Sequence, residues 1–417
     1  MRNLKKRILT LFAATSLCIS SLSIAGCGST GSSNAESDTI KIGHMSDLSG
    51  EMATTGPWNA TELAVKEINE SGGVLGKQIE LVSVDTQSDT KRYQEMAKKL
   101  VLEDGVKAVF TNGSSASREA IRPFLEQNKT VYFYNSVYEG GVASKYVFCT
   151  GGIPEQQILP MLEYAKENNL GNKVFLVSPD YNYGQICSEW VQEYAKELGI
   201  EIAGVEYIPL GVSQFSSTIS KIQNSGADMV FTLLVGGSHY SFFEQWATAD
   251  IGDINIVSSN LFANYEHLRF PSPTLDNAYS ITNYFEELDT DASKEFVSKM
   301  KENYPDEEYI TCEMETAYNA VYLWKEAVEK AGTADCDKVV EALESGEISF
   351  DSPGGTITMD GVSHQTTANM YIIQCTPEHK LNEVKELPDQ EPTYLKSIGV
   401  DLRDSAPNKQ FSPLEDK

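Results

Sequence analysis

Hydroxyl, amide and aromatic side chains directly follow short apolar runs at three places in the chain. The runs and the loops behind them are 106–110 with TNGSSASRE, 173–177 with SPDYNYGQ, and 228–235 with GGSHYSFFEQW. Hydroxyl groups and the N–H groups of a helix start can hold a carbonyl or carboxylate oxygen without a charged side chain. Tyr181 and Tyr183 would add apolar walls with polar tips. The pattern favours noncovalent binding of a small polar molecule. Alternatively, the tyrosines only pack over a strand end and the serines only cap helices.

Each of these stretches is predicted to be a buried strand, a loop and the start of a helix. The alternation begins with a strand at 39–45 and starts again at Pro154, which indicates βαβ units in two similar lobes with mostly parallel sheets. A chain of 417 residues with 41% hydrophobic residues is large enough for both. Ligands of such sheets bind at the carboxyl ends of the strands, where all three loops would lie.

No catalytic residue, metal site or cofactor is predicted. The sequence contains no GxSxG, HExxH, phosphate loop with lysine or Asp-rich calcium loop, and its five histidines have no ligand spacing. Asp180 and Glu139 both lie in candidate site loops and could form a catalytic carboxylate pair. A surface or supporting role is the other interpretation of these two residues.

The N-terminus has the layout of a secretory signal. Four basic residues lie among the first seven, and an apolar run extends from Ile8 to about Ile24. The small residues before Cys27 resemble the lipobox of bacterial lipoproteins. Residues 1–26 are therefore predicted to be a lipoprotein signal peptide, and residues 27–38 a Gly/Ser-rich tether that begins with the lipidated cysteine. Alternatively, an ordinary signal peptide is cleaved further along the chain.

The mature chain is expected to be strongly acidic. The formal charge of the whole chain is −27, and loss of four positive charges with the signal peptide would make it −31. Nucleic acid and anionic lipid surfaces repel such a protein, so neither is expected as a partner. The charge says little about the ligand, because high charge first of all keeps a protein in solution.

The cysteines after Cys27 predict no metal site and no disulfide framework. They are Cys149, Cys187, Cys312, Cys336 and Cys375. Their number is odd and none has CxxC spacing. One pair could form in an exported protein, but buried free thiols are the default interpretation.

Several segments resemble the type I periplasmic binding proteins, the receptors for branched-chain amino acids, short amides and urea that serve ATP-driven importers. The resemblance covers about 39–375 and includes GHMSDLSG (43–50), KEINESGGVLGK (66–77), SSASR (114–118), YNSVYEG (134–140), LGVSQFSSTISKI (210–222) and NMYI (369–372). SASR, YEG and DSPGG with HQT are closest to the urea and short-chain amide branch.

The resemblance implies an α/β fold of two Rossmann-like lobes joined by a three-crossing hinge. The first lobe would comprise residues 39–153 and 281–349, and the second lobe residues 154–280 and 350–385. Residues 386–417, with four prolines, are predicted to be a loose tail. The ligand would be clamped between the lobes as they close.

The resemblance also implies the ligand-binding residues. These are Ser115, Tyr134 and Ser136 in the first lobe and Tyr181, Tyr183, Gly237 and Ser238 in the second. Ser115 would hold the ligand oxygen, and Ser136 with a tyrosine would accept from its N–H₂ group. Two departures leave the ligand open: Gly113 stands where amide receptors usually have an aromatic ring, and Gly184-Gln185 where they usually have Pro-Arg. An amino acid would need a partner for its ammonium group, for which Asp180 and Glu139 are the candidates.

These observations predict a lipid-anchored binding protein of an ABC transporter, on the outer face of a bacterial cytoplasmic membrane. It would capture urea or short-chain amides and deliver them to membrane permease subunits. The alternative ligand class is branched-chain or other amino acids. Two alternatives of other classes are a ligand-sensing regulator, disfavoured by the signal and Cys27, and an enzyme that turns over its bound amide.

Overall fold

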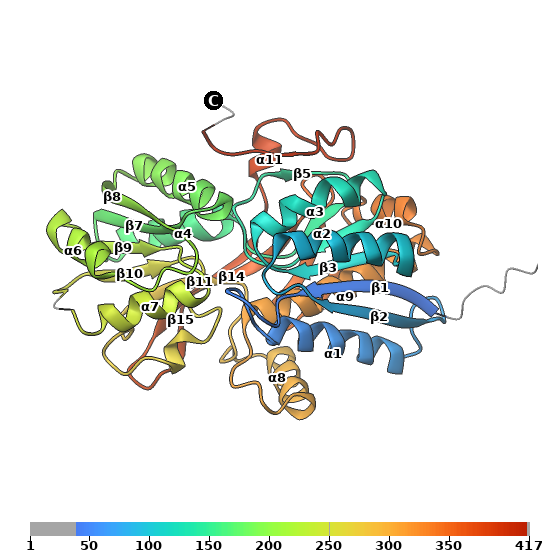
Figure 1. Ribbon diagram of the computed structural model, residues 1–417, viewed down its shortest axis with the longest axis horizontal. Coiled ribbons are helices and arrows are strands. Elements are labelled where there is room, and N and C mark those ends of the chain that lie inside the picture. Colours follow the sequence, from blue (N-terminus) through green and yellow to red (C-terminus); the bar gives the residue numbers. More distant parts are fainter. Residues whose placement is uncertain (1–38, 250, 415–417) are drawn as a thin grey trace, which may run out of the picture. The chain divides into compact units, whose positions relative to one another are not determined.

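A computed structural model describes residues 39–249 and 251–414, which form two lobes around one continuous sheet (Figure 1). The strand order is β2-β1-β3-β4-β6-β14-β11-β10-β9-β7-β8. The predicted signal peptide, the lipidated Cys27 and the tether lie outside the described residues.

The first lobe is built on the parallel strands β2, β1, β3, β4 and β6. Its elements are β1 (Thr39–Ser46), α1 (Gly56–Glu70), β2 (Gln78–Asp85), α2 (Thr90–Lys99), η1 (Leu100–Asp104), β3 (Ala108–Asn112), α3 (Ser115–Gln127), β4 (Val131–Tyr134), β5 (Val142–Ala143), β6 (Val147–Cys149), α8 (Asp291–Asn303), α9 (Cys312–Ala331), α10 (Cys336–Leu343), β12 (Ser349–Ser352) and β13 (Gly355–Asp360). The central strand β3 is buried on both faces, which explains the consecutive apolar residues from Ala108 to Phe110.

The second lobe repeats this plan around the parallel strands β8, β7, β9, β10 and β11. Its elements are α4 (Pro154–Glu167), β7 (Lys173–Pro179), α5 (Asn182–Leu198), β8 (Glu201–Ile208), α6 (Ser216–Ser225), β9 (Met229–Thr232), α7 (Gly237–Trp246), β10 (Asn255–Ser258), η2 (Glu266–Leu268), β11 (Ala278–Thr282) and β15 (Leu381–Gln390). Beyond it lie α11 (Tyr394–Ser397) and β16 (Lys409–Gln410).

Strand β14 (Gln365–Cys375) belongs to both lobes. It pairs with β6 and β13 of the first lobe at its start, and with β11 and β15 of the second lobe further on. The chain also passes between the lobes after β6 and after β11. The predicted α/β class with two lobes and mostly parallel sheets is confirmed.

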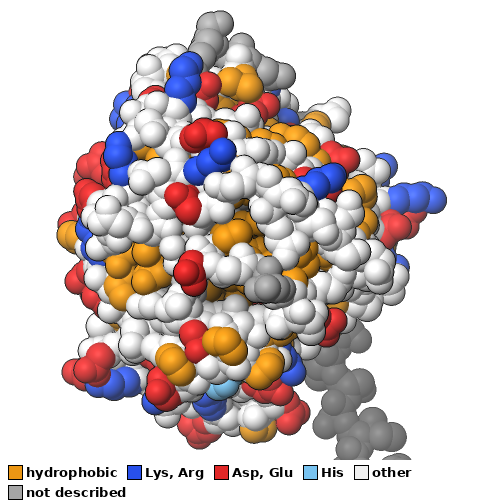
Figure 2. Space-filling view, turned by 90° about the vertical axis from the view of Figure 1, so that its left-hand side faces the viewer, with side chains coloured by type: hydrophobic (Ala, Val, Ile, Leu, Met, Phe, Trp, Pro, Cys, Tyr) orange, Lys and Arg blue, Asp and Glu red, His pale blue; other side chains and the backbone are white. Residues whose placement is uncertain are grey.

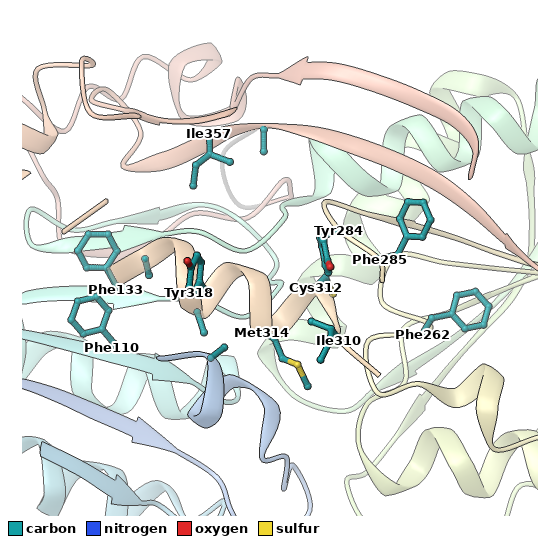
Figure 3. Packing of buried hydrophobic residues seen from close by; sticks show 14 of the residues in the cluster. Phe110, Phe133, Phe262, Tyr284, Phe285, Ile310, Cys312, Met314, Tyr318 and Ile357 are labelled. Carbon is teal, nitrogen blue, oxygen red and sulfur yellow. The ribbon is translucent and has the colours of Figure 1, made fainter. Parts of the chain in front are cut away.

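Helix α9 packs its apolar side chains against β3 and β4 (Figure 3). Phe110 and Phe133 stack with ring centroids 5.2 Å apart, and the edge of Trp324 meets Phe110 at 6.3 Å. Figure 3 also shows Tyr318 and Met314 projecting from α9; Tyr318 contacts Phe296 of α8 and Phe350 of β12, and Met314 lies against Gly56 of α1. The packing fixes the start of α9 beside the ends of the first-lobe strands.

Two predicted boundaries are wrong. Residues 350–360 belong to the first lobe, because Phe350 stacks on Tyr322 of α9 at 4.4 Å and β13 pairs with the first-lobe end of β14. The segment 386–414 is not a loose tail. Strand β15 continues to Gln390, β16 pairs with β5, and Leu395 and Leu402 are buried in a core of their own.

On the face at the second-lobe end of the molecule, charged side chains of both signs are interspersed (Figure 2). Figure 2 looks at the second-lobe end of the molecule and shows acidic side chains scattered between basic and apolar ones. This distribution agrees with a role of the acidic excess in solubility. The cysteines at 149, 187, 312, 336 and 375 are free thiols, and all of them except Cys336 are buried. Over residues 39–249 and 251–414, no helix combines the length and the apolar character that crossing a bilayer requires.

The buried His44 of β1 is expected to make stability depend on pH. Burial lowers its pKa from 6.5 to about 3, so the folded state stays unprotonated where the unfolded state binds a proton. The buried His44 therefore does not lower the free energy of unfolding above pH 6.5, but it lowers this free energy increasingly as the pH drops toward 3. Between pH 7.5 and pH 5.5, His44 should lower the free energy of unfolding by about 1.4 kcal/mol. Urea unfolding at both pH values should show that His44→Leu removes this part of the loss. An equal loss in both proteins would contradict the assignment.

Candidate functional site

A cavity of about 350 Å³ lies where the strand ends of the two lobes face each other. In the first lobe it is lined by the loop 50–54 after β1 and by residues at the ends of β3 and β4. From the second lobe it receives the residues that follow β7, β9 and β10. A cavity of this size can enclose a ligand with a dozen or more heavy atoms.

Six of the seven predicted site residues line this cavity. They are Ser115, Tyr134, Ser136, Tyr181, Tyr183 and Gly237. Ser238 does not line it and is buried in the first turn of α7. The structure thus brings the predicted residues of both lobes together.

Ser115 lies at the cavity, but its hydroxyl group is already engaged. Its Oγ donates to Oε2 of Glu139 at 2.6 Å and accepts from a guanidinium nitrogen of Arg118 at 3.3 Å. A hydroxyl has one proton to donate, so Ser115 does not offer it to a ligand in this arrangement. The helix cap is the preceding residue, Ser114, whose Oγ accepts from Ser117 N at 3.1 Å.

Neither predicted ammonium partner faces the cavity. Glu139 is fully buried and forms an ion pair with Arg118 at 2.7 Å. Asp180 is exposed and accepts a hydrogen bond from Gln185 at 3.0 Å. Both expectations came from loop position alone, which does not fix side-chain direction.

Glu313 is a carboxylate that lines the cavity, and it is not among the residues predicted from the sequence. It lies in the first turn of α9 and accepts from Asn112 Nδ2 at 3.2 Å, Ser136 Oγ at 3.0 Å and Val137 N at 3.3 Å. Burial raises its pKa above the ordinary value, although these hydrogen bonds favour the charged form. In the sequence it resembles any acidic residue that stabilises a helix start.

Tyr93 explains why residue 113 is glycine. A Cβ at Gly113 would lie 2.1 Å from the Tyr93 hydroxyl, which is itself held at 3.2 Å by a carboxylate oxygen of Asp47. Gly184 is likewise set by packing, since a Cβ there would lie 2.0 Å from the carbonyl oxygen of Pro179. The glycines at both departures from the amide receptors are thus explained by packing within their own lobes.

A histidine and a glutamate form a buried pair at the second-lobe wall. His239 lines the cavity, and its Nδ1 lies 3.2 Å from Oε1 of Glu266. Burial is the largest influence on Glu266 and would raise its pKa, but the interactions with His239 and with backbone N–H groups together outweigh burial and lower that pKa. This pair stiffens the wall formed by the start of α7.

The two lobes touch at the cavity mouth. Glu51 of the first lobe lies so close to Gly236 of the second that a Cβ there would be 2.3 Å from its carbonyl oxygen. Gly236 also has φ +56° and ψ −142°, which side chains with a Cβ rarely adopt. Only glycine therefore permits this approach.

Gly236→Ala is expected to weaken ligand binding about tenfold or more, because the new Cβ keeps the lobes apart and strains the loop. Isothermal titration would measure the dissociation constant. Gly237→Ala is the matched control with a smaller expected loss, since its Cβ would meet only the side-chain end of Glu51, at 3.6 Å. Equal affinities of wild type and Gly236→Ala would show that this contact is not needed.

Comparison with known proteins gives the family. A family model described as periplasmic binding protein matches residues 39–380. The leucine-, isoleucine-, valine-, threonine- and alanine-binding protein of Pseudomonas aeruginosa is 26% identical over 394 residues, which cover 92% of this chain and 100% of that protein.

Solved structures show the same fold. The branched-chain amino acid transporter substrate binding protein LivJ of Streptococcus pneumoniae, in complex with isoleucine, has a TM-score of 0.74 at 23% identity and covers 84% of this chain and 99% of its own. A solute binding protein of an ABC transporter from Rhodopseudomonas palustris, in complex with 3,4-dihydroxybenzoic acid, has a TM-score of 0.76 at 22% identity. The match covers 85% of this chain and 98% of that chain. The family consists of solute-binding proteins rather than enzymes. The chain belongs to the periplasmic binding protein family and has its two-lobed type I fold.

Proposed function

We propose that this protein is the extracytoplasmic binding component of an ABC importer and that its ligand is an amino acid. The observation that carries the ligand class is Glu313, a carboxylate at the cavity wall that is suited to an ammonium group. Among the described residues that line the cavity, Glu51 is a further acid and none is lysine or arginine. An anion without an amino group would meet these acids with no basic side chain to offset them.

The carboxylate of an amino acid would bind at the other side of the cavity. The start of α3 presents backbone N–H groups beside Gly113 and Ser115, and a helix start favours an anion. Tyr134, Tyr181 and Tyr183 would enclose the side chain. Ser136 would help to hold Glu313 in place through its hydrogen bond. The similarity to amino-acid-binding proteins supports this class.

Urea or short-chain amides are the second candidate class. The segments SSASR and YEG favour it, as do the hydroxyl groups around the cavity, which suit a neutral polar ligand. The cavity of about 350 Å³ favours the larger amino acid, since urea has only four heavy atoms. In either case the protein would be exported, lipid-anchored through Cys27, and would deliver its ligand to permease subunits.

A thermal-shift panel on the chain from Asp38 onward tests the proposal. Bound ligand is first removed, and the twenty common amino acids, urea, formamide, acetamide and butyramide are each added. A ligand at a hundredfold excess over its dissociation constant adds about 2.7 kcal/mol and raises the melting temperature visibly. A rise with amino acids alone supports the first class, and a rise with urea or amides alone supports the second. No rise with any of them would overturn both.

A further inference from the structure

The C-terminal segment, residues 391–414, lies across both lobes and is named here the clasp. In the first lobe its strand β16 pairs with β5, and Phe411 N donates to Gly141 O at 2.8 Å. At the second lobe, Tyr394 meets Trp190 of α5 edge-on at 4.7 Å, and its N–H donates to Glu155 of α4 at 3.2 Å. Figure 1 shows this segment, with α11, passing over the region between α5 and β5. The clasp thus joins parts of the chain that would separate if the lobes moved apart.

The side-chain amide of Gln410 in the clasp forms hydrogen bonds with both residues of the buried Arg118–Glu139 ion pair. Its Nε2 donates to Oε1 of Glu139 at 2.6 Å, and its Oε1 accepts from Arg118 at 3.1 Å. Both charged side chains have no exposed surface. Buried charges require such partners, because they have lost their contacts with water.

Glu139 also connects the clasp with the cavity and with the second lobe. Ser115, which lines the cavity, donates to its carboxylate at 2.6 Å. Asn182 of the second lobe donates to it at 3.0 Å and lies between the cavity residues Tyr181 and Tyr183. One carboxylate therefore holds together a cavity wall of each lobe and the clasp.

We propose that the clasp holds the two lobes in their closed arrangement, and that Gln410 is the positioning residue that sets how long the cavity stays closed. Gln410 does not line the cavity and acts through Glu139 on Ser115 and Asn182. The inference rests on the proposed function only in taking the closed cavity as the ligand-holding state. Its test needs no ligand, so its failure would leave the proposed function untouched.

Single-molecule energy transfer on the full-length chain in detergent tests the clasp. One dye is attached through azidophenylalanine at the exposed Glu70 of α1, and the other at the exposed Ser217 of α6. The ligand-free protein should visit a high-transfer, closed state. Gln410→Ala and Gln410→Met should shorten its dwell time about tenfold, the effect of losing a hydrogen bond to a charged group. Gln410→Met keeps the bulk of the side chain, so the same effect in both variants assigns it to the amide.

Arg403→Ala is the matched control within the clasp, because Arg403 is exposed and its described hydrogen bonds all go to Asp401. It should leave the dwell time unchanged. Circular dichroism would verify that each variant is folded. A purely structural role would lower the melting temperature of the Gln410 variants at an unchanged dwell time, and this would overturn the proposal. The proposal would also be overturned if the wild-type protein never entered the closed state, or if Arg403→Ala shortened the dwell time of that state as much as the Gln410 variants do.

Discussion

Glu313→Gln is expected to weaken amino acid binding about a hundredfold, the largest effect on affinity that the cavity allows. Glutamine has nearly the same size and keeps a carbonyl oxygen for Asn112 and Ser136, so the cavity wall should survive. Isothermal titration at pH 7.5 with the amino acid found by the thermal-shift panel measures the change.

Glu315→Gln is the matched control for this prediction. Glu315 lies two residues further along α9 and is equally acidic, but it faces away from the cavity. It accepts hydrogen bonds from Asn283 at 2.6 Å and Ser352 at 2.7 Å. Its substitution should lower the free energy of unfolding and leave the ligand affinity of the folded protein unchanged. A less than tenfold loss in Glu313→Gln would contradict the prediction and mean that Glu313 is not the partner of the ammonium group.

The location of the cavity could be predicted from the sequence because parallel strands all end at one edge of their sheet. Three loops with hydroxyl and aromatic residues follow three apolar runs, and this places Ser115, Tyr181 and Gly237 around one cavity without knowledge of any contact. The same regularity predicted the two lobes, since a repeated strand-loop-helix pattern has few other solutions.

Side-chain direction and long-range contacts could not be predicted in this way. Glu313 reaches the cavity from α9, 177 residues along the chain from its partner Ser136, and nothing in its local pattern distinguishes it from an ordinary acidic helix start. Glu139 was placed in the right loop with the wrong partner. Its direction depends on Arg118 and on Gln410, which is 271 residues away.

The C-terminal segment shows how composition can mislead. Its prolines and charges are typical of an unstructured tail. Leu395 and Leu402 nevertheless bury their side chains, and a proline-rich segment loses little entropy when it is ordered, since each proline is already restricted. The spacing of these two apolar residues within a polar segment was the available signal for docking on the lobes.

Arg118→Ala is expected to lower the free energy of unfolding by about 3–5 kcal/mol, the largest effect on stability among these predictions. The guanidinium group is fully buried over the perpendicular rings of Tyr134 and Tyr138, at 4.9 and 5.0 Å from their centroids. It forms ion pairs with Glu139 at 2.7 Å and Glu119 at 3.0 Å. Its removal leaves the Glu139 carboxylate buried without its cation and opens a space beside two aromatic rings. Urea unfolding of the chain from Asp38 onward measures the loss.

A second variant separates the charge from the volume. Arg118→Met fills much of the space, so any destabilisation that remains reports the unpaired carboxylate of Glu139. When Glu139→Gln is added to Arg118→Met, no charge is left unpaired, and the one carbonyl oxygen of glutamine can still accept from Ser115. The double variant should therefore be more stable than Arg118→Met alone. Additive losses would instead mean that Arg118 stabilises the protein through Tyr134, Tyr138 and Glu119, and that the ion pair with Glu139 contributes little.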